Sequence, residues 1–264
     1  MEYEIAARLS PASPLPGYGL GDCLGGRGSN DEAMTAYQQA IALDNDNSLR
    51  RHLTLGWITT YQQEWDRAIV AYQQAVELAP GNLEAYHRLA GLWYGQKHDP
   101  GRAIQTLKAG LSFHPDDVNL RLSIGNVYRE TKEFARAEEW YRRAAGLDPS
   151  NGAPHWHLGR SYQDQGMLAE AATEYQAAVA LTPGNAWYHA SLAEALAQQG
   201  EGEQAIVEYK QAARLDPRNA SYHVRLGDLY RDAGRAEDAK AAYQAALALQ
   251  PHDEYVKRQL TQLP

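Results

Sequence analysis

Residues 118–151 decide the fold, and they read VNLRLSIGNVYRETKEFARAEEWYRRAAGLDPSN. Apolar or small side chains recur there at spacings of three and four, first over 120–128 and again over 134–147. This spacing places them on one face of each of two amphipathic helices. The pair Asp148-Pro149 is expected to stop the second helix, because proline disfavours the helical conformation of the residue before it.

The same pattern recurs along the chain with a period of 34 residues. A proline follows most of the second helices, and the intervals between these prolines are 35, 34, 34, 34 and 34 residues: Pro80, Pro115, Pro149, Pro183, Pro217 and Pro251. A fixed period of this length indicates an array of small helical units, each of which contacts only its neighbours. Small residues such as Gly125 and Ala144 allow the two helices of a unit to approach closely, and Asn151 can cap the helix that opens the next unit.

Extending this register in both directions assigns the whole chain, 1–264, to a single solenoid. The predicted parts are a half repeat (1–13), a degenerate repeat (14–48), six full repeats (49–82, 83–117, 118–151, 152–185, 186–219 and 220–253) and a capping helix (254–264). Residues 3–11 match 209–217, which indicates that the chain begins in the middle of a second helix. We therefore expect a fragment of a longer array; the alternative is a natural start that uses the half repeat as its cap.

Two parts of the array depart from the pattern. Six glycines between positions 17 and 28 argue against a stable first helix in 14–48, because each interior glycine costs about 0.5–1 kcal/mol relative to alanine. Asn45 also stands where the proline is expected. The repeat 83–117 holds one extra residue within 95–101, and we expect that turn to be the most irregular part of the central array.

Equivalent positions of the units carry the same residue types. A Leu-Gly-type pair recurs in the first helices as Leu20-Gly21, Leu55-Gly56, Leu89-Ala90, Ile124-Gly125, Leu158-Gly159, Leu192-Ala193 and Leu226-Gly227. Alanine opens the second helices at Ala33, Ala68, Ala103, Ala137, Ala171, Ala205 and Ala239. On these residues nearly the whole chain resembles the tetratricopeptide repeat (TPR) family. The resemblance implies an all-α fold, a right-handed α-solenoid of antiparallel helix pairs (a superhelix) whose first helices line the concave face.

The concave face that this resemblance implies carries the second, fifth, ninth and twelfth residues of each unit. Trp, Tyr and Arg, the residue types enriched at binding hot spots, are frequent there. We expect a groove for a peptide or protein lined by Trp57, His87, Tyr94, Asn126, Arg129, Trp156, Arg160, Gln163, Trp187, Glu194, Asp228 and Arg231. The alternative is that these rings only pack against neighbouring helices. The Lys/Asn/Lys/Arg set with which some family members clamp a terminal carboxylate lacks its lysines here.

Metal, cofactor and catalytic sites are not expected. Four of the nine histidines, His52, His155, His189 and His223, occupy one equivalent position, and packed helices lie roughly 8–10 Å apart, too far for one tetrahedral metal site. We expect these rings to be half-buried between units. The chain also lacks a Gly-x-Ser-x-Gly elbow, a phosphate loop and a His-Glu-x-x-His motif. It is therefore not expected to be an enzyme.

Charge and hydropathy limit the partners further. The formal net charge of −8 argues against nucleic acid and anionic membrane surfaces, both of which select basic faces. Cys23 is the single cysteine, so no disulfide can form within one chain. No run of 18 apolar residues and no signal peptide is present in the sequence, which favours a cytoplasmic location unless the chain is part of a larger protein.

The predicted function is a non-catalytic scaffold that binds a protein or peptide segment in the groove. Two alternatives remain open at this point. The chain could be the TPR arm of a larger protein, such as a membrane-anchored transferase or ligase, or it could self-associate into a homo-oligomer through its N-terminal end.

Overall fold

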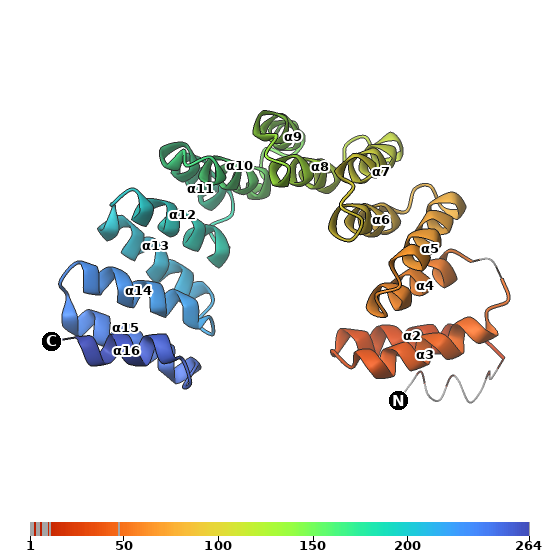
Figure 1. The fold of residues 1–264 in the computed structure, drawn as a ribbon, viewed down its shortest axis with the longest axis horizontal. Coiled ribbons are helices and arrows are strands. Elements are labelled where there is room, and N and C mark those ends of the chain that lie inside the picture. The colour runs from red at the N-terminus through yellow and green to blue at the C-terminus, as the bar shows by residue number, and fades with distance from the viewer. Residues whose placement is uncertain (1–2, 4–5, 7–9, 11, 47, 264) are drawn as a thin grey trace. The chain divides into compact units, whose positions relative to one another are not determined.

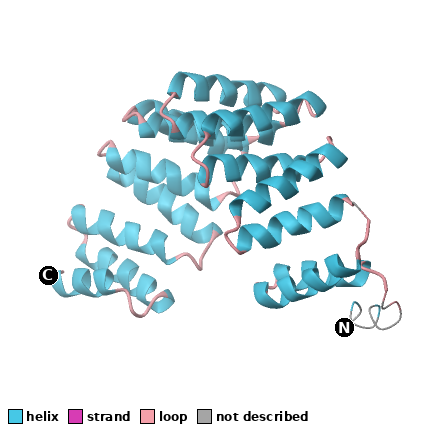
Figure 2. Cartoon of the chain, turned by 45° about the vertical axis from the view of Figure 1, so that its right-hand side comes forward, coloured by secondary structure: helices cyan, strands magenta, loops and turns pink. Residues whose placement is uncertain are grey.

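The computed structural model describes residues 3, 6, 10, 12–46 and 48–263, and all regular structure among them is α-helical (Figures 1 and 2). The predicted all-α class is thereby confirmed. Most of the half repeat predicted over 1–13, including the end through which self-association was considered, lies outside the described residues.

The chain forms two compact units, Met1–Val127 (unit 1) and Tyr128–Pro264 (unit 2). Unit 1 holds α2 (Leu15–Gly26), α3 (Asn30–Leu43), α4 (Leu49–Tyr61), α5 (Trp65–Leu78), α6 (Leu83–Gly95) and α7 (Pro100–Phe113). The division falls within α8 (Val118–Glu130). Unit 2 holds α9 (Phe134–Leu147), α10 (Gly152–Asp164), α11 (Leu168–Leu181), α12 (Ala186–Gln198), α13 (Gly202–Leu215), α14 (Ala220–Asp232), α15 (Ala236–Leu249) and α16 (Glu254–Gln262).

In several pairs of consecutive helices, a tyrosine of the second helix lies on a glycine of the first. A Cβ atom added to Gly159 on α10 would lie 2.6 Å from the ring of Tyr175 on α11, and one added to Gly56 on α4 would lie 2.6 Å from the ring of Tyr72 on α5. Both tyrosines are almost fully buried. Absence of a side chain at the glycine therefore creates the space that the ring fills, and the two helices of a pair share one core.

The turn inside each pair has one residue in the left-handed region. These residues are Gly28, Gly166, Gly200 and Gly234, and also the non-glycine residues Gln63, His98 and Lys132. The turn within 95–101 was expected to be irregular, and four residues separate α6 from α7 there, Gln96 to Asp99. It still keeps the left-handed residue, and Asp99 caps α7 by accepting a hydrogen bond of 2.9 Å from the Arg102 amide.

Helix α2 forms in spite of its glycines, so the expectation that they would prevent a stable first helix is wrong. Gly19 is covered by the ring of Tyr3 and Gly21 by the ring of Tyr37, at distances that leave no room for a Cβ atom. Close packing of these rings favours the helix more than glycine's poor propensity opposes it. The remaining Gly28 has a φ of +81° in the turn that follows.

A buried carboxylate holds the turn in which Asn45 replaces the usual proline. Asp44 is 6 % exposed, and its Oδ2 atom accepts hydrogen bonds from the Tyr18 hydroxyl at 2.7 Å and the Ser48 hydroxyl at 2.9 Å. These bonds, that from Tyr18 foremost, lower the pKa of the Asp44 carboxyl although its burial acts in the opposite direction. A hydrogen-bonded aspartate thus stabilises a turn that proline stabilises elsewhere in the chain.

Side-chain caps begin most first helices. The Asn151 side chain accepts a hydrogen bond of 2.9 Å from the Ala153 amide, which confirms its prediction as the cap of α10. Asn185 and Asn219 cap α12 and α14 in the same way. Asp253 caps α16, and Val256 of that helix is fully buried in the core of the last pair.

Candidate functional site

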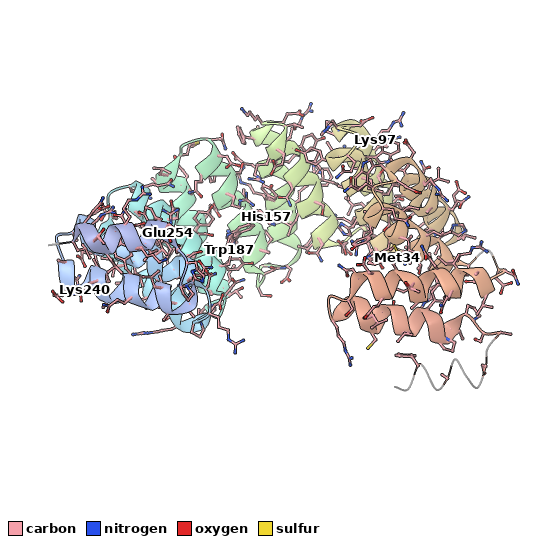
Figure 3. The ribbon with its side chains drawn as sticks, turned by 60° about the horizontal axis from the view of Figure 1, so that its bottom comes forward. Met34, Lys97, His157, Trp187, Lys240 and Glu254 are labelled. Carbon is pink, nitrogen blue, oxygen red and sulfur yellow. The ribbon has the colours of Figure 1, made fainter. Side chains whose placement is uncertain are left out.

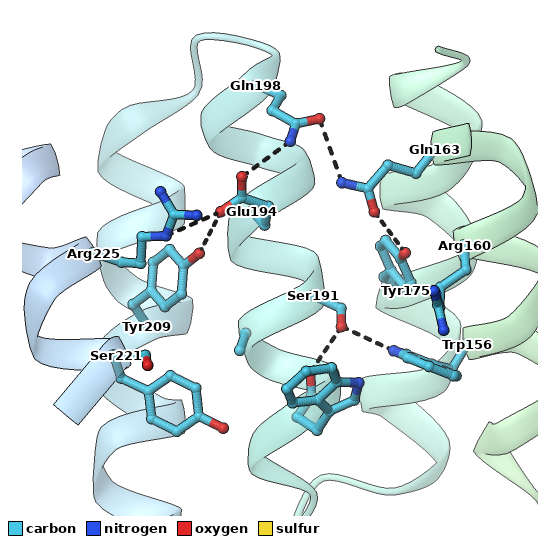
Figure 4. A pocket seen from close by; sticks show the side chains of 13 residues that line it. Trp156, Arg160, Gln163, Tyr175, Ser191, Glu194, Gln198, Tyr209, Ser221 and Arg225 are labelled. Carbon is cyan, nitrogen blue, oxygen red and sulfur yellow. Dashed lines mark hydrogen bonds and ion pairs between the residues drawn. The ribbon is translucent and has the colours of Figure 1, made fainter. Parts of the chain in front are cut away.

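Three first helices of unit 2, α10, α12 and α14, lie side by side and present one common face, which we call the groove face (Figure 4). A pocket of about 460 Å³ opens on it. Its lining residues come from five successive helices and are Trp156, Arg160, Gln163, Tyr175, Trp187, Ala190, Ser191, Glu194, Gln198, Tyr209, Ser221, Tyr222 and Arg225. Five of the predicted groove residues are among them: Trp156, Arg160, Gln163, Trp187 and Glu194.

Two tryptophans form the aromatic wall of the pocket. The ring of Trp156 on α10 lies 6.4 Å from the ring of Trp187 on α12 and stacks on Tyr188 at 6.2 Å. Its Nε1–H donates a hydrogen bond of 2.9 Å to the Ser191 hydroxyl. Trp187, labelled in Figure 3, is 56 % exposed. The wall therefore consists of one fixed ring and one ring that is open to solvent.

A cation without a carboxylate partner stands beside this wall. The guanidinium of Arg160 lies over the Trp156 ring, 5.1 Å from its centre, which is a cation–π geometry. In the described part of the chain, no carboxylate forms an ion pair with it. By contrast, Arg225 on the opposite side of the pocket lies 3.7 Å from Glu194. Arg160 is thus the cationic group of the pocket that is available to a ligand.

A chain of hydrogen bonds forms the polar wall and can be followed in Figure 4. The Tyr175 hydroxyl donates to Gln163 at 2.8 Å, Gln163 donates to Gln198 at 3.4 Å, and Gln198 donates to Glu194 at 3.0 Å. From the other side, the Tyr209 hydroxyl donates to Glu194 at 2.8 Å. Burial raises the pKa of both tyrosines, and the bond to Glu194 raises that of Tyr209 further. Both hydroxyls therefore remain protonated donors that hold this wall in place.

His157 packs behind the Trp156 ring and carries no charge at neutral pH. Its ring lies 4.9 Å from that of Trp156 and stacks on Tyr141 at 5.3 Å. Burial, with smaller contributions from the charges of Arg129 and Arg160, lowers the pKa of His157 to about 4. Its Nδ1 atom is buried and has no hydrogen-bond partner among the described residues. The ring thus supports the aromatic wall as a neutral packing group.

The remaining predicted groove residues of unit 2 are engaged inside the protein. Arg129 is 6 % exposed, and its guanidinium pairs with Asp164 at 2.6 Å and with Glu130. Asp228 accepts hydrogen bonds of 2.7 Å from the hydroxyls of Tyr243 and Tyr255. Arg231 donates to Gln259 at 2.6 Å and to Asp232 at 2.8 Å. These three side chains join helices rather than present themselves to a ligand.

The predicted residues of unit 1 do not share one pocket. Trp57 stacks on Tyr61 at 5.7 Å and lines a pocket of about 330 Å³ with Arg50 and other residues of α2, α3, α4 and α6. The Nδ1 atom of His87 lies 3.3 Å from the Ser123 hydroxyl, and burial lowers the pKa of the His87 ring. Tyr94 on α6 and Asn126 on α8 are half-buried. The aromatic and charged groups are therefore gathered more densely in unit 2.

Several lining residues were not among the predicted ones. Ser191 and Arg225 hold the sixth position of their repeats, which the four-position pattern omits, although Ser191 follows Trp187 by one helical turn. Tyr175 and Tyr209 belong to the buried cores of their helix pairs, but their hydroxyls reach the pocket. A pattern of first-helix positions misses them because they lie on second helices.

The equivalent histidines act within single repeats. The Nδ1 atom of His155 lies 2.7 Å from Glu174, and that of His189 lies 2.6 Å from Glu208, so each ring contacts the second helix of its own pair. His52 is buried. Across the described residues, no three His, Cys, Asp or Glu side chains gather as metal ligands would. None of the described helices combines the length and the hydropathy that crossing a bilayer requires.

Comparison with known proteins gives one consistent result. Sequence models described as TPR repeat or tetratricopeptide repeat match residues 18–47, 94–152, 159–200, 193–230 and 220–253. A comparison with curated proteins finds no match.

Solved structures share the fold at low sequence identity. A tetratricopeptide repeat protein from Parabacteroides merdae is 15 % identical, covers 94 % of this chain and 97 % of its own, and superposes with a TM-score of 0.63. YrrB, described as a TPR protein with an unusual peptide-binding site, is 21 % identical over 74 % of this chain and 100 % of its own, with a TM-score of 0.53. The APC/C hetero-tetramer Cut9–Hcn1 matches 87 % of this chain and 45 % of its own at 15 % identity, with a TM-score of 0.60.

Proposed function

Since the chain belongs to the tetratricopeptide-repeat family, we propose that it is a non-catalytic scaffold whose groove face in unit 2 binds a peptide segment of a partner protein. Repeat proteins of this kind use the surface formed by stacked units for binding. The structural relative YrrB is described as having a peptide-binding site, which supports the same use of the fold here.

One observation carries the proposal. Trp187 keeps 56 % of its surface exposed at the rim of a pocket that also holds Arg160, which pairs with no carboxylate of the described residues. Leaving a large apolar ring in water is unfavourable by roughly 25 cal/mol per Å² of apolar surface, so a partner that covers it gains affinity. Trp and Arg are also the side chains that most often dominate binding energy. The pocket volume of about 460 Å³ suits one or two side chains of a ligand.

Selection from a displayed library of random peptides tests this proposal. Peptides enriched on the whole protein are expected to lose most of their binding when Trp187→Ala removes the exposed ring. The matched control is Trp140→Ala, which removes the same side chain from α9, outside the pocket. Enriched peptides that bind the Trp187→Ala protein as well as the original would overturn the proposal.

A further inference from the structure

The charges of the groove face are unevenly satisfied. Two of its arginines meet an acidic group of their own chain, Arg225 at Glu194 and Arg231 at Asp232, and so does Arg129 on the neighbouring α8, at Asp164. Arg160 has no such partner among the described residues, although the chain as a whole is acidic with a net charge of −8. An arginine left unpaired in an acidic protein favours a ligand that brings a negative charge.

The guanidinium of Arg160 is held in position before any ligand arrives. It lies over Trp156, and that ring is fixed by its hydrogen bond to Ser191 and by the neighbouring ring of His157. Arginine presents a planar fork of N–H donors that matches a carboxylate in two parallel hydrogen bonds. Because the supporting ring restricts the guanidinium in advance, little conformational freedom is lost on binding.

The exposed ring and this cation are linked through the Trp156 ring. The Arg160 guanidinium lies 5.1 Å from the centre of that ring, which is 6.4 Å from the centre of the Trp187 ring. In an extended peptide the rise is about 3.3 Å per residue and alternate side chains share one side, so residues two apart are separated by about 6.6 Å. The side chains of a glutamate and an aromatic residue extend this reach, so one peptide strand can place a carboxylate on Arg160 and a ring on Trp187.

We infer that the groove face of unit 2 selects an extended peptide in which an aspartate or glutamate stands two residues from an aromatic residue. The carboxylate of the acidic side chain binds Arg160 and the aromatic ring packs on Trp187. This specificity rests on the proposed function and gives the partner's chemistry. The amides of Gln163 and Gln198, which share a long bond of 3.4 Å, line the same pocket and can form hydrogen bonds with the backbone of such a peptide.

The probes are short synthetic peptides with both ends blocked, so that the only carboxylate is on a side chain. One is acetyl-Ala-Glu-Ala-Tyr-Ala-amide; the others replace its Glu by Gln, its Glu by Lys, or its Tyr by Ala. Binding is followed on the full chain through the indole N–H signals in ¹⁵N–¹H NMR spectra. The Glu peptide is expected to bind about tenfold more tightly than the Gln peptide, because a carboxylate accepts two parallel hydrogen bonds from the guanidinium and attracts its charge, whereas the Gln amide offers one neutral oxygen.

Variants assign this preference to Arg160. Arg160→Gln is expected to make the Glu and Gln peptides bind equally, and Arg160→Lys to restore part of the difference, because it keeps the charge but not the fork. The control is Arg143→Gln: Arg143 also lies 5.1 Å above a tryptophan, Trp140, but on α9 and paired with Glu139. It should retain the tenfold preference. Circular dichroism confirms that each variant is folded.

The outcomes separate the two proposals. Equal binding of the Glu and Gln peptides to the original protein overturns the acidic preference, as does a preference that survives Arg160→Gln. If library-selected peptides still depend on Trp187 in that case, the proposed function stands and only the peptide chemistry is wrong. If neither the synthetic nor the selected peptides depend on Trp187, both are wrong.

Discussion

The indole Nε1–H of Trp156 on α10 donates a hydrogen bond of 2.9 Å to the hydroxyl of Ser191 on α12. Ser191 in turn donates to the backbone carbonyl of Trp187, also at 2.9 Å. One small side chain therefore links both tryptophans of the groove face, although Trp156 and Ser191 are 35 residues apart.

Removing this hydroxyl should loosen the aromatic wall. Ser191→Ala leaves the half-buried Trp156 N–H without its partner, and the expected loss is about 1 kcal/mol in the free energy of unfolding. The indole signal of Trp156 should shift strongly in the ¹⁵N–¹H spectrum. Ser221→Ala is the control, because Ser221 lines the same pocket, and among the described residues no indole N–H donates to its hydroxyl. An unchanged Trp156 signal in Ser191→Ala would contradict the hydrogen bond.

The helix crossing of α10 and α11 should tolerate no added methyl group. A Cβ atom at Gly159 would lie 2.6 Å from the Tyr175 ring, so Gly159→Ala is expected to cost about 1–3 kcal/mol of stability through overpacking. At Gly146 on α9, an added Cβ atom would meet open space. Gly146→Ala should therefore stabilise the protein by up to about 1 kcal/mol, because alanine favours the helix. Urea unfolding of the two variants measures both. Equal effects would show that propensity rather than packing governs Gly159.

The left-handed turn positions offer a stabilising change. Lys132 has a φ of +63°, a conformation that costs a residue with a Cβ atom about 1 kcal/mol and glycine very little. Lys132→Gly should therefore raise the free energy of unfolding by several tenths of a kcal/mol up to about 1 kcal/mol. Gly200 occupies the equivalent turn with a φ of +85°. Gly200→Ala should lower the free energy of unfolding by a similar amount. Thermal unfolding of both variants checks the opposite signs.

His157 should make unit 2 sensitive to acid. Its pKa is about 4 in the folded protein, below the ordinary value of 6.5, so the unfolded chain takes up a proton first as the pH falls. The contribution of the neutral ring to the free energy of unfolding is fully present above pH 6.5. As the pH falls from 6.5 to 4, this contribution is lost, by about 3 kcal/mol in all.

The variant His157→Phe isolates this effect. Phenylalanine keeps the ring contacts with Tyr141 and Trp156 but cannot take up a proton. The stability difference between the two proteins, measured by urea unfolding from pH 7.5 to pH 4, should grow in favour of the variant as the pH falls. A difference that does not change with pH would refute the lowered pKa.

Local features of the structure were largely predictable from the sequence. Helix ends, the cap at Asn151 and the stop at Asp148 depend on residues within one turn, and they appear where they were expected. The first helix of the degenerate repeat was wrongly doubted, because glycine propensity was considered without the rings of Tyr3 and Tyr37 that cover Gly19 and Gly21. Propensity is local, whereas the packing that outweighs it involves another helix.

Which groove residues are available could not be read from their positions. Arg129 and Arg160 both stand at groove positions, and both were expected to meet a ligand. Arg129 is buried by its pairing with Asp164, 35 residues further on, while Arg160 lies over the face of Trp156 and forms no ion pair with the residues that the structure describes. Each outcome depends on the neighbouring repeat, which the pattern within one repeat does not describe.

By itself, the sequence determined that this protein is an array of helix pairs, because side-chain periodicity, small residues at helix crossings and proline stops act over a few residues. The tertiary structure alone decided which polar groups of the groove face satisfy one another. Trp156 binds Ser191, Glu194 binds Tyr209, and Arg160 has no ion-pair partner in the described part of the chain. Hydrogen bonds and ion pairs between repeats are set by side-chain geometry at separations of a few ångströms, and a residue's place in a 34-residue period does not specify that geometry.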